Sequence, residues 1–312
     1  RSSLREFIAT VGCLIIDEVH LVGDPTRGAT LESLIARLRA VEGRTRIVAL
    51  SATVSNAEEL ANWFNAQLVR SAWRPTILTT QLVPYDTPPP GSKHEEYEAA
   101  KDAALEPLIR ELRAATPDDS RVIDGSSVQG SGSVLVFCGS KNGVRRTAAM
   151  VARVPFWNVE DDDLVDSTFR AGIGMHFRDA PRAGRALDAF KVRKIQTLVA
   201  TSGLSTGVNT PARSVVIRDL ELGLSPLEVS QAQQMFGRAG RAGQEPEGFG
   251  FMLVPREEEA EWKLRLAAGY TAQSQVIDHL GDALLAEILL GSIVDRQGAA
   301  SWFKETFAFA QS

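Results

Sequence analysis

Short apolar segments separated by longer amphipathic ones dominate the hydrophobic pattern of this chain. The apolar segments are rich in β-branched residues and do not alternate cleanly with polar positions, which is typical of strands buried on both faces of a parallel sheet. Six segments have this pattern: CLIID (13–17), RIVALS (46–51), VLVFC (134–138), IQTLVATS (195–202), SVVIRD (214–219) and FGFMLV (249–254). The pattern therefore predicts parallel sheets that are covered on both sides.

The amphipathic segments between these strands have helical spacing. The apolar residues of segment 30–41 fall on one helical stripe: Leu31, Leu34, Ile35 and Leu38. Segment 55–64 begins with a capping box made by Ser55 and Glu58, and segment 95–115 predicts a further helix. Strands that alternate with helices indicate an α/β, doubly wound architecture.

Two segments rich in proline, glycine or serine interrupt this alternation, at 84–94 (PYDTPPPGSKH) and at 124–133 (DGSSVQGSGS). Strand signals also stop after residue 255, and the remaining sequence is helical in pattern. We therefore divide the chain into four parts: a first α/β domain (1–84), a proline-rich connector (85–94), a second α/β domain (95–255) and a helical third unit (256–312).

Composition narrows the classes of protein that fit. The 312 residues carry a net charge of −5, so a nucleic-acid site would have to be local rather than part of a broad basic surface. No apolar run approaches the roughly 18 residues that span a bilayer, and no export signal is recognisable, so we expect a cytoplasmic protein without a membrane partner. Cys13 and Cys138 each lie in a predicted buried strand, which favours reduced core thiols over a disulfide.

Two adjacent carboxylates, Asp17 and Glu18, directly follow the first predicted strand. Ligands of parallel sheets bind at the carboxyl ends of the strands, where these side chains are expected. One carboxylate there suits Mg²⁺, held through water, while its neighbour suits the orientation or deprotonation of a water that attacks a phosphate. The string alone leaves a second interpretation equally open, a solvated acidic pair that ends a strand.

Four further strings resolve this choice by resemblance. LSATVSN (50–56), VFCGSKNG (136–143), LVATSGLSTGVNTPAR (198–213) and QQMFGRAGRAG (233–243) follow DEVH (17–20) in the chain. Their order and their places at strand ends or helix starts resemble the motifs of superfamily 2 DExH-box helicases of the Ski-like branch. The resemblance implies tandem RecA-like (P-loop NTPase) domains that use ATP and Mg²⁺ and bind single-stranded or partly duplex nucleic acid, either DNA or RNA.

The resemblance also implies a role for individual residues. Asp17 and Glu18 would hold Mg²⁺ through water, with Glu18 as base, and His20 would couple the ATP site to the neighbouring domain. The residues implied at the nucleotide are Ser51, Thr53, Gly207 and Asn209. The residues implied at nucleic-acid phosphates are Ser140, Lys141 and Thr201. A plain Ser/Thr turn for segment 50–56 and a structural glycine loop for segment 198–213 remain the alternatives.

Gln234, Arg238 and Arg241 recur at spacings of four and three, which would place them on one helix face if that segment is helical. Two guanidinium groups aimed at one point suit the charge that develops on a transferring phosphoryl group. The alternative is a Gly/Arg-rich surface turn. By the resemblance, these arginines and the Asp17–Glu18 pair belong to different domains, so the catalytic site would be complete only when the domains close.

The chain departs from the family pattern in two places and resembles it again in its last segment. It contains no G-x-x-x-x-G-K-[ST] loop, so the phosphate cradle is absent and the first RecA-like domain is expected to be incomplete. The family's His-His-Ala-Gly string reads GMHFRDAPRAG (174–184) here, with Phe177 in place of the second histidine. The segment 256–312 resembles the beginning of a winged-helix domain, and we expect it to pack against the motor domains.

The sequence therefore predicts a fragment of an ATP-dependent helicase or translocase, itself nearly inactive in ATP hydrolysis and expected as a monomer, although the oligomeric state is open. The alternative function is a non-catalytic nucleic-acid-binding or scaffold protein with a degenerate helicase fold. Three features are assigned structural roles: the acidic run 160–166 as a solvated loop, the scattered His94, His176 and His279 as non-ligands, and Trp63–Phe64 as core.

Overall fold

The computed structural model describes residues 11–40, 46–52, 54–71, 73–74, 76–114, 121–123, 126–128, 132–204, 210, 212–240 and 247–312. Contacts divide the chain into two compact units. The first unit combines Arg1–Ser71 with Ala268–Ser312, and the second is Ala72–Ala267. The first unit is therefore built from two segments that are far apart in the sequence.

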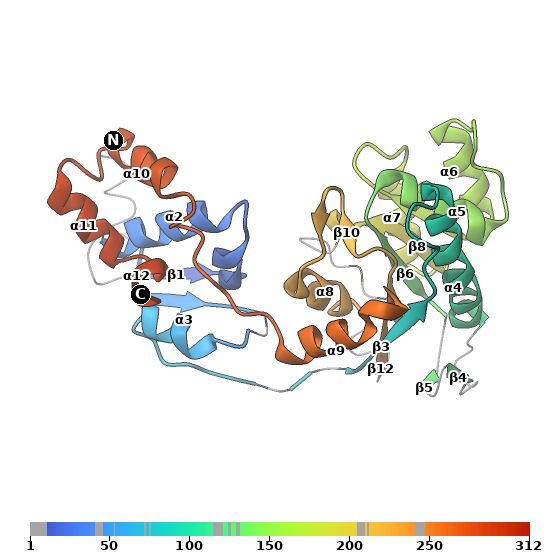
Figure 1. The fold of residues 1–312 in the computed structure, drawn as a ribbon, viewed down its shortest axis with the longest axis horizontal. Helices are drawn as coiled ribbons and strands as arrows, with labels where there is room; N and C mark the ends of the chain where they lie inside the picture. The colour runs from blue at the N-terminus through green and yellow to red at the C-terminus, as the bar shows by residue number, and fades with distance from the viewer. Residues whose placement is uncertain are drawn as a thin grey trace. The chain divides into compact units, whose positions relative to one another are not determined.

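The second unit contains a six-stranded sheet with the order β3-β12-β9-β6-β8-β7 (Figure 1). Every neighbouring pair in it is parallel. The strands are β3 (Ile77–Tyr85), β6 (Val134–Cys138), β7 (Ile173–His176), β8 (Thr197–Thr201), β9 (Ser214–Ile217) and β12 (Glu247–Pro255). Its helices are α4 (His94–Ala114), α5 (Lys141–Ala152), α6 (Asp161–Arg170), α7 (Ala183–Lys191) and α8 (Val229–Phe236). The α/β class with a parallel sheet, predicted from the apolar pattern, is confirmed.

Burial explains why the strands of this sheet read as unbroken apolar runs. All five residues of β6 and all four of β9 are buried, because helices cover the sheet. On one face, α4 packs Leu105, Ile109 and Leu112 into the same core as the alternate β6 residues Val134 and Val136. Burying each of these side chains contributes about 1.5–3 kcal/mol, so the helix and sheet stabilise one another.

The first unit contains two parallel strands, β1 (Cys13–Ile16) and β2 (Arg46–Ala49). A 3-10 helix, η1 (Val19–Gly23), follows β1, and the helices α2 (Gly28–Ala40) and α3 (Ala57–Trp63) complete the first segment. The second segment adds α10 (Leu280–Leu289), α11 (Arg296–Lys304) and α12 (Phe307–Ala310), drawn in red near the blue α2 in Figure 1. Residues 268–312 thus pack with the first segment, whereas residues 256–267 of the expected third unit belong to the second unit.

Polar contacts fasten the C-terminal segment to the first. The Asn56 side chain pairs with the backbone of Ala272, donating to its carbonyl at 2.7 Å and accepting from its amide at 2.9 Å. Glu32 of α2 is fully buried and accepts from the Ala308 amide at 2.9 Å and from the Ser274 hydroxyl at 2.7 Å. These bonds satisfy buried groups from both segments, so neither segment is complete alone.

Smaller elements connect the main ones. Two antiparallel hairpins are formed by β4 (Arg121–Ile123) with β5 (Ser126–Val128) and by β10 (Glu221–Leu222) with β11 (Ser225–Pro226). Short 3-10 helices occur at η2 (Ser202–Leu204) and η3 (Arg256–Glu258), and α9 (Glu259–Ala268) follows β12. No helix within the described ranges is long and apolar enough to cross a membrane.

The structure differs from the sequence-based division at the end of the first domain. That division placed residues up to 84 in the first domain, whereas β3 pairs along its whole length with β12 in the sheet of the second unit. The strand escaped detection because ILTTQLVPY mixes polar residues with apolar ones and contains Pro84. An edge strand tolerates both, since one side of it needs no partner. The interpretation of 256–312 as the start of a winged helix stays a prediction.

Local predictions also need correction. The residue that precedes α3 is Asn56 rather than Ser55, and Ser55 instead donates to the Tyr270 carbonyl and contacts the Thr271 hydroxyl. Cys13 is exposed, whereas Cys138 is buried as expected, and both are free thiols. The acidic run begins α6 rather than a loop, because carboxylates in the first turn of a helix are stabilised by its dipole. Trp63 is buried, as predicted.

The stripe predicted for α2 is displaced by one position. Ile35 is buried, but Leu34 is 45% exposed, and the buried face also contains Glu32 and Ser33. The reason is the C-terminal segment, which supplies hydrogen-bond donors to Glu32 and so makes a polar position suitable for burial. A pattern based on hydrophobicity alone assigns such a position to the surface.

Candidate functional site

The turn after β1 places two carboxylates at the carboxyl edge of the β1–β2 pair. Asp17 and Glu18 are both exposed, and Asp17 Oδ1 accepts a hydrogen bond from the Glu18 amide at 2.9 Å. Glu18 has φ 55° and ψ 42°, a left-handed conformation that costs a non-glycine residue about 1–2 kcal/mol. A strained backbone that holds an acidic side chain in solvent is a feature of functional turns.

His20 links this turn to the end of β2. Its side chain is only 1% exposed, and Nδ1 lies 3.2 Å from the Ala52 amide and 3.3 Å from Glu18 Oε2. The two contacts require different protonation states of His20. The Ala52 amide can donate only to an unprotonated Nδ1, whereas an ion pair with Glu18 needs a protonated ring. Burial lowers the pKa of His20, against the opposing influence of Glu18 and Asp17. At neutral pH the ring is therefore neutral, and Nδ1 accepts from Ala52.

Backbone hydrogen bonds reinforce this link between the two strand ends. The Val19 amide donates to the Leu50 carbonyl at 2.9 Å, and the Leu50 amide donates to the Ile16 carbonyl at 2.8 Å. Ser51 lies next to them, exposed, and its hydroxyl donates to the Ala52 carbonyl at 2.8 Å. The DEVH and LSAT strings, 30 residues apart, thus form one connected edge. Thr53 lies outside the described residues.

Tyr270 of the C-terminal segment completes the surroundings of His20, and sequence reasoning missed it. Its ring meets the imidazole edge to face, with centroids 6.2 Å apart, and its hydroxyl lies 3.4 Å from the His20 carbonyl. Its own carbonyl accepts from the Ser55 amide at 2.8 Å. A β-carbon at Gly23 would overlap the Tyr270 hydroxyl, so any larger residue there would force the Tyr270 side chain to move. No local pattern could have revealed a partner 250 residues away.

In the second unit, the predicted phosphate-contacting residues lie at the carboxyl edge of the sheet. Ser140 follows β6 and caps α5, where its Oγ accepts from the Gly143 amide at 3.0 Å. Lys141 is half exposed and pairs with Asp161 at 2.8 Å. Thr201 ends β8 and is paired in register with Cys138 at the end of β6. The fold therefore brings these three residues to neighbouring strand ends.

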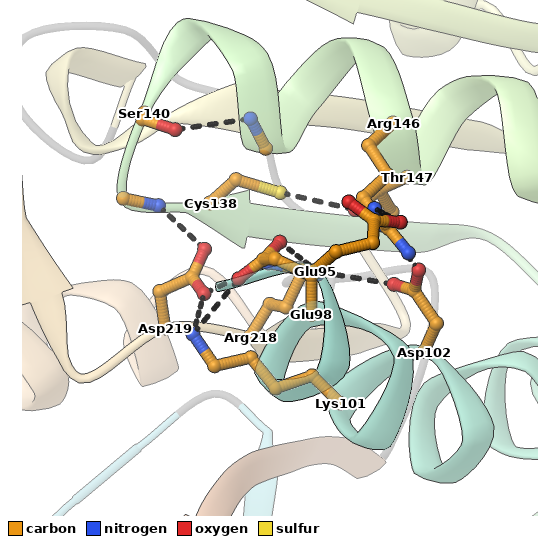
Figure 2. Close-up of polar contacts among 12 residues, drawn as sticks. Glu95, Glu98, Lys101, Asp102, Cys138, Ser140, Arg146, Thr147, Arg218 and Asp219 are labelled. Atoms are coloured by element: carbon orange, nitrogen blue, oxygen red, sulfur yellow. Dashed lines mark hydrogen bonds and ion pairs between the residues drawn. The ribbon is translucent and has the colours of Figure 1, made fainter. Parts of the chain in front are cut away.

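A buried ionic network holds the loop that carries Ser140 (Figure 2). Asp219 Oδ2 accepts from the Gly139 amide at 2.9 Å, and its Oδ1 accepts from Arg218 and Lys101, each at 2.8 Å. Arg218 is 1% exposed and also donates to Glu98 at 2.7 Å and Asp102 at 3.0 Å. Asp102 in turn pairs with Arg146, which also contacts Glu95.

Mutual compensation keeps this network charged. Burial alone would raise the pKa of Asp219, but Arg218 and Lys101 outweigh it and hold that pKa below its usual value. Burial would likewise lower the pKa of Arg218, yet the carboxylates of Asp219 and Glu98 raise it overall. Because Arg218 and Lys101 hold one oxygen of Asp219 in place, the other oxygen fixes the position of the Gly139 amide.

Gln234 lies in α8, but that helix ends at Phe236, with Gly237 as its C-cap. Arg238 follows the helix, and its carbonyl accepts from the Ala212 amide at 2.9 Å. Gln234 and Arg238 therefore do not share a helix face, because α8 ends two residues before Arg238. Gly240, which follows Arg238, has φ 87° and so is not helical. Arg241, Gly207 and Asn209 lie outside the described residues.

The described histidines and carboxylates do not form a closed metal centre. Across the part of the chain that the structure describes, no group of three or more His, Cys, Asp or Glu side chains could hold a metal ion. A cation at the Asp17–Glu18 turn would need further ligands from water or a bound phosphate, which is the usual situation for Mg²⁺.

Comparison with protein families gives two matches in chain order. Residues 2–60 match the model of the DEAD/DEAH box helicase, and residues 120–243 match the model of the helicase conserved C-terminal domain. The first match covers the edge formed by DEVH and LSAT, and the second covers most of the sheet of the second unit.

Curated relatives agree with these matches. The chain is 30% identical to the ATP-dependent DNA helicase Hel308 of Thermoplasma volcanium, across 97% of this chain and 45% of that protein. It is 32% identical to Hel308 of Pyrobaculum calidifontis, across 82% of this chain and 38% of that protein. It is 29% identical to the activating signal cointegrator 1 complex subunit 3 of Gallus gallus, across 98% of this chain and 14% of that protein. The chain thus spans less than half the length of these relatives.

Proposed function

Because this chain belongs to the DEAD/DEAH box helicases of superfamily 2, in their Ski-like branch, we propose that it forms part of an ATP-driven motor that moves along single-stranded nucleic acid. One observation carries the proposal. The Asp17–Glu18 turn is strained, exposed and tied through His20 to the LSAT string, an arrangement that suits a nucleotide sensor better than a plain strand end.

The reaction proposed is the in-line attack of water on the γ-phosphate of ATP. Glu18 would orient and deprotonate the water, since its side chain extends into solvent beside Asp17. The two adjacent carboxylates offer the oxygen donors that Mg²⁺ prefers, and the ion when bound would neutralise phosphate charge. Asp17 would hold it through water.

Arginine side chains of the second unit would complete the site. We assign Arg238 and Arg241 to the charge that develops on the transferring phosphoryl group, with Gln234 beside them, and Gly207 and Asn209 to the nucleotide. An arginine in this role contributes about 10³–10⁵ in rate. Since these groups belong to a different unit from Asp17 and Glu18, hydrolysis would depend on closure of the two units and could be coupled to movement.

The nucleic acid would follow the carboxyl edge of the sheet of the second unit. Ser140, Lys141 and Thr201 lie at neighbouring strand ends there, and amides, hydroxyls and a single lysine suffice for phosphate contacts. Several relatives are named as DNA helicases, so DNA is the first track to test. Binding of matched DNA and RNA strands at several salt concentrations would separate the two.

The decisive experiment measures nucleic-acid-stimulated ATP hydrolysis by the longest native protein that contains this chain. Glu18→Gln keeps the shape of the side chain and removes its basicity, so we expect turnover to fall by about 10²–10⁴-fold while binding of ATP and of single strands persists. The control is Glu58→Gln, which changes an exposed carboxylate of α3 in the same unit.

The competing function is a non-catalytic scaffold that has kept the fold, since the sequence given holds no phosphate-binding loop. A scaffold would bind nucleic acid without any hydrolysis that Glu18→Gln could remove. Turnover equal in the wild type and the Glu18→Gln variant would therefore contradict the motor.

A further inference from the structure

The chain that follows α9 runs beside the end of the LSATVSN string. Tyr270 forms a parallel β-bridge with Val54, and its carbonyl accepts from the amide and the hydroxyl of Ser55 at 2.8 and 3.2 Å. Two residues later, the backbone of Ala272 pairs with the Asn56 side chain. All of these bonds use the backbone of the C-terminal segment, so they place Tyr270 independently of its own side chain.

The side chain of Tyr270 contacts η1, the 3-10 helix that follows the acidic turn, near its beginning and at its end. Near the beginning, the ring meets the His20 imidazole edge to face, with centroids 6.2 Å apart. At the end, the hydroxyl occupies the space that a β-carbon on Gly23 would need. Val19 and Val22 of η1 belong to the core cluster against which Tyr270 packs. The ring therefore restrains η1 as a whole.

The position of η1 matters because it joins the acidic turn to the LSAT string. His20 Nδ1 accepts from the Ala52 amide at 3.2 Å, and the Val19 amide donates to the Leu50 carbonyl at 2.9 Å. Glu18 directly precedes η1 in the chain. A shift of η1 would therefore weaken both hydrogen bonds and move the Glu18 carboxylate relative to the LSAT string.

From these contacts we infer that Tyr270 is a positioning residue for ATP hydrolysis: its ring holds η1, and η1 sets where the Glu18 carboxylate lies. The inference rests on the proposed function, because it concerns the water-orienting role given to Glu18. Tyr270 has no contact with nucleotide or water in this scheme and acts through His20 and η1. One determinant of the ATP site would then lie in the C-terminal segment, 250 residues from His20.

The chain offers a matched control for the loss of this ring contact. Phe309 lies in the same C-terminal segment and meets Phe303 edge to face, with centroids 6.0 Å apart. Phe309→Leu therefore removes a ring pair of similar geometry from the same unit without removing the ring that faces His20. Tyr270→Phe is the conservative variant, since it keeps the ring and loses only a hydroxyl whose hydrogen bond to the His20 carbonyl is a long 3.4 Å.

The first test measures steady-state ATP hydrolysis by the longest native protein that contains this chain. Tyr270→Leu should lower kcat by about tenfold or more, because a misplaced catalytic carboxylate is less effective. The KM for ATP should stay within about twofold, since the orientation of water affects the transition state rather than nucleotide binding. Tyr270→Phe should retain most of the wild-type kcat, and Phe309→Leu should leave kcat unchanged.

The second test needs no ATP and uses the 312-residue chain. Hydrogen exchange of the Val19 and Ala52 amides reports the two bonds that η1 makes with the LSAT string. Tyr270→Leu should speed the exchange of both amides by about tenfold, whereas Tyr270→Phe and Phe309→Leu should leave them within about twofold. The Ala308 amide, which donates to Glu32 elsewhere in the same unit, is the internal control and should not change.

The two tests separate failure of this inference from failure of the motor proposal. Wild-type protein that hydrolyses no ATP, together with faster Val19 and Ala52 exchange in Tyr270→Leu, would contradict the motor but support Tyr270 as the residue that positions the turn. Unchanged exchange at both amides would overturn the positioning role even if hydrolysis is robust. An equal loss of kcat in Tyr270→Leu and Phe309→Leu, or a rise in KM with kcat unchanged, would also overturn it.

Discussion

The strand-end loops of the two units are held by different kinds of interaction. In the first unit, the Asp17–Glu18 turn is fixed by backbone hydrogen bonds, a neutral His20 and the ring of Tyr270. In the second unit, the Gly139 loop is fixed by Asp219, which is embedded among buried charges. The difference teaches that a buried ionic anchor sets one position firmly, whereas neutral contacts allow a turn to rearrange at lower cost.

This difference suits the roles proposed for the two loops. A turn that responds to nucleotide state must change its contacts during each cycle, and neutral hydrogen bonds exchange without moving charge through a low-dielectric interior. A loop that supports phosphate contacts benefits from staying in place. Two substitutions test whether the two anchors behave as described, and a third tests the buried carboxylate that joins α2 to the C-terminal segment.

The largest effect is expected from Arg218→Met. Removal of one partner from a buried ion-pair network leaves Asp219, Glu98 and Asp102 without their shared cation, which costs about 3–5 kcal/mol. Native-state hydrogen exchange of the β6 and β9 amides measures this loss within the second unit. Arg256→Met, which breaks the exposed pair with Asp86, is the control and should leave these amides unchanged. Similar exchange in both variants would mean that the network does not stabilise the loop.

A smaller effect is expected from Gly23→Ala. The added methyl group overlaps the Tyr270 hydroxyl, and overpacking of this kind costs about 1–3 kcal/mol. Tyr270→Phe removes the overlapping oxygen, so the cost of Gly23→Ala should shrink in that background. Urea unfolding of the four proteins gives the coupling energy. Gly12→Ala has open space around its new methyl group and should cost the same with and without Tyr270→Phe. If its coupling energy with Tyr270→Phe were as large as that of Gly23→Ala, the contact between Gly23 and Tyr270 would be contradicted.

The smallest effect is a pH dependence from Glu32. Burial raises the pKa of this carboxyl above 4.5, against the hydrogen bonds from Ala308 and Ser274. The folded state then binds the proton more tightly than the unfolded state, so stability falls as pH rises from about 4.5 through the folded-state pKa, by at most about 1.4 kcal/mol per pH unit. Glu32→Gln does not titrate and should abolish this decline, as followed by urea unfolding between pH 4 and 8. If the fall in stability with pH persisted unchanged in Glu32→Gln, another group would be its cause. Glu58→Gln changes an exposed carboxylate and is the control, in which the fall should remain.

Sequence patterns predicted the buried centre of the fold better than its edges. VLVFC gives the bounds of β6 without error, because every residue of that strand is buried and apolar. Strand β3 was missed because an edge position permits the threonines and Pro84 that obscure its pattern. The shared helix face of Gln234 and Arg238 was predicted only on the condition that the segment is helical, and α8 ends at Phe236, so that condition is not met.

The candidate site was predictable where its residues are neighbours in the sequence. Asp17, Glu18 and His20 lie within one turn, and the structure brings Ser51 to the same edge. The residues that hold the two strand-end loops, Tyr270 in the first unit and Arg218 in the second, were not predictable, because both act across long separations in the chain. Arg218 in particular appears in the sequence as the end of an apolar strand. Its neighbour Asp219 is visible there, but its partners Glu98 and Asp102 become visible only when α4 packs on the sheet.

The first unit is discontinuous, and this has a consequence for how the protein is made. During synthesis, Asn56 leaves the ribosome long before Ala272, with which it forms two hydrogen bonds, and all of Ala72–Ala267 is translated in between. At about 5–20 residues per second, the nascent first segment stays without its covering helices for roughly ten seconds or more. The second unit can fold during that interval, so we expect the order of folding to run against the order of the sequence. Nascent chains arrested before residue 268 would then bind chaperones through the uncovered faces of α2 and α3.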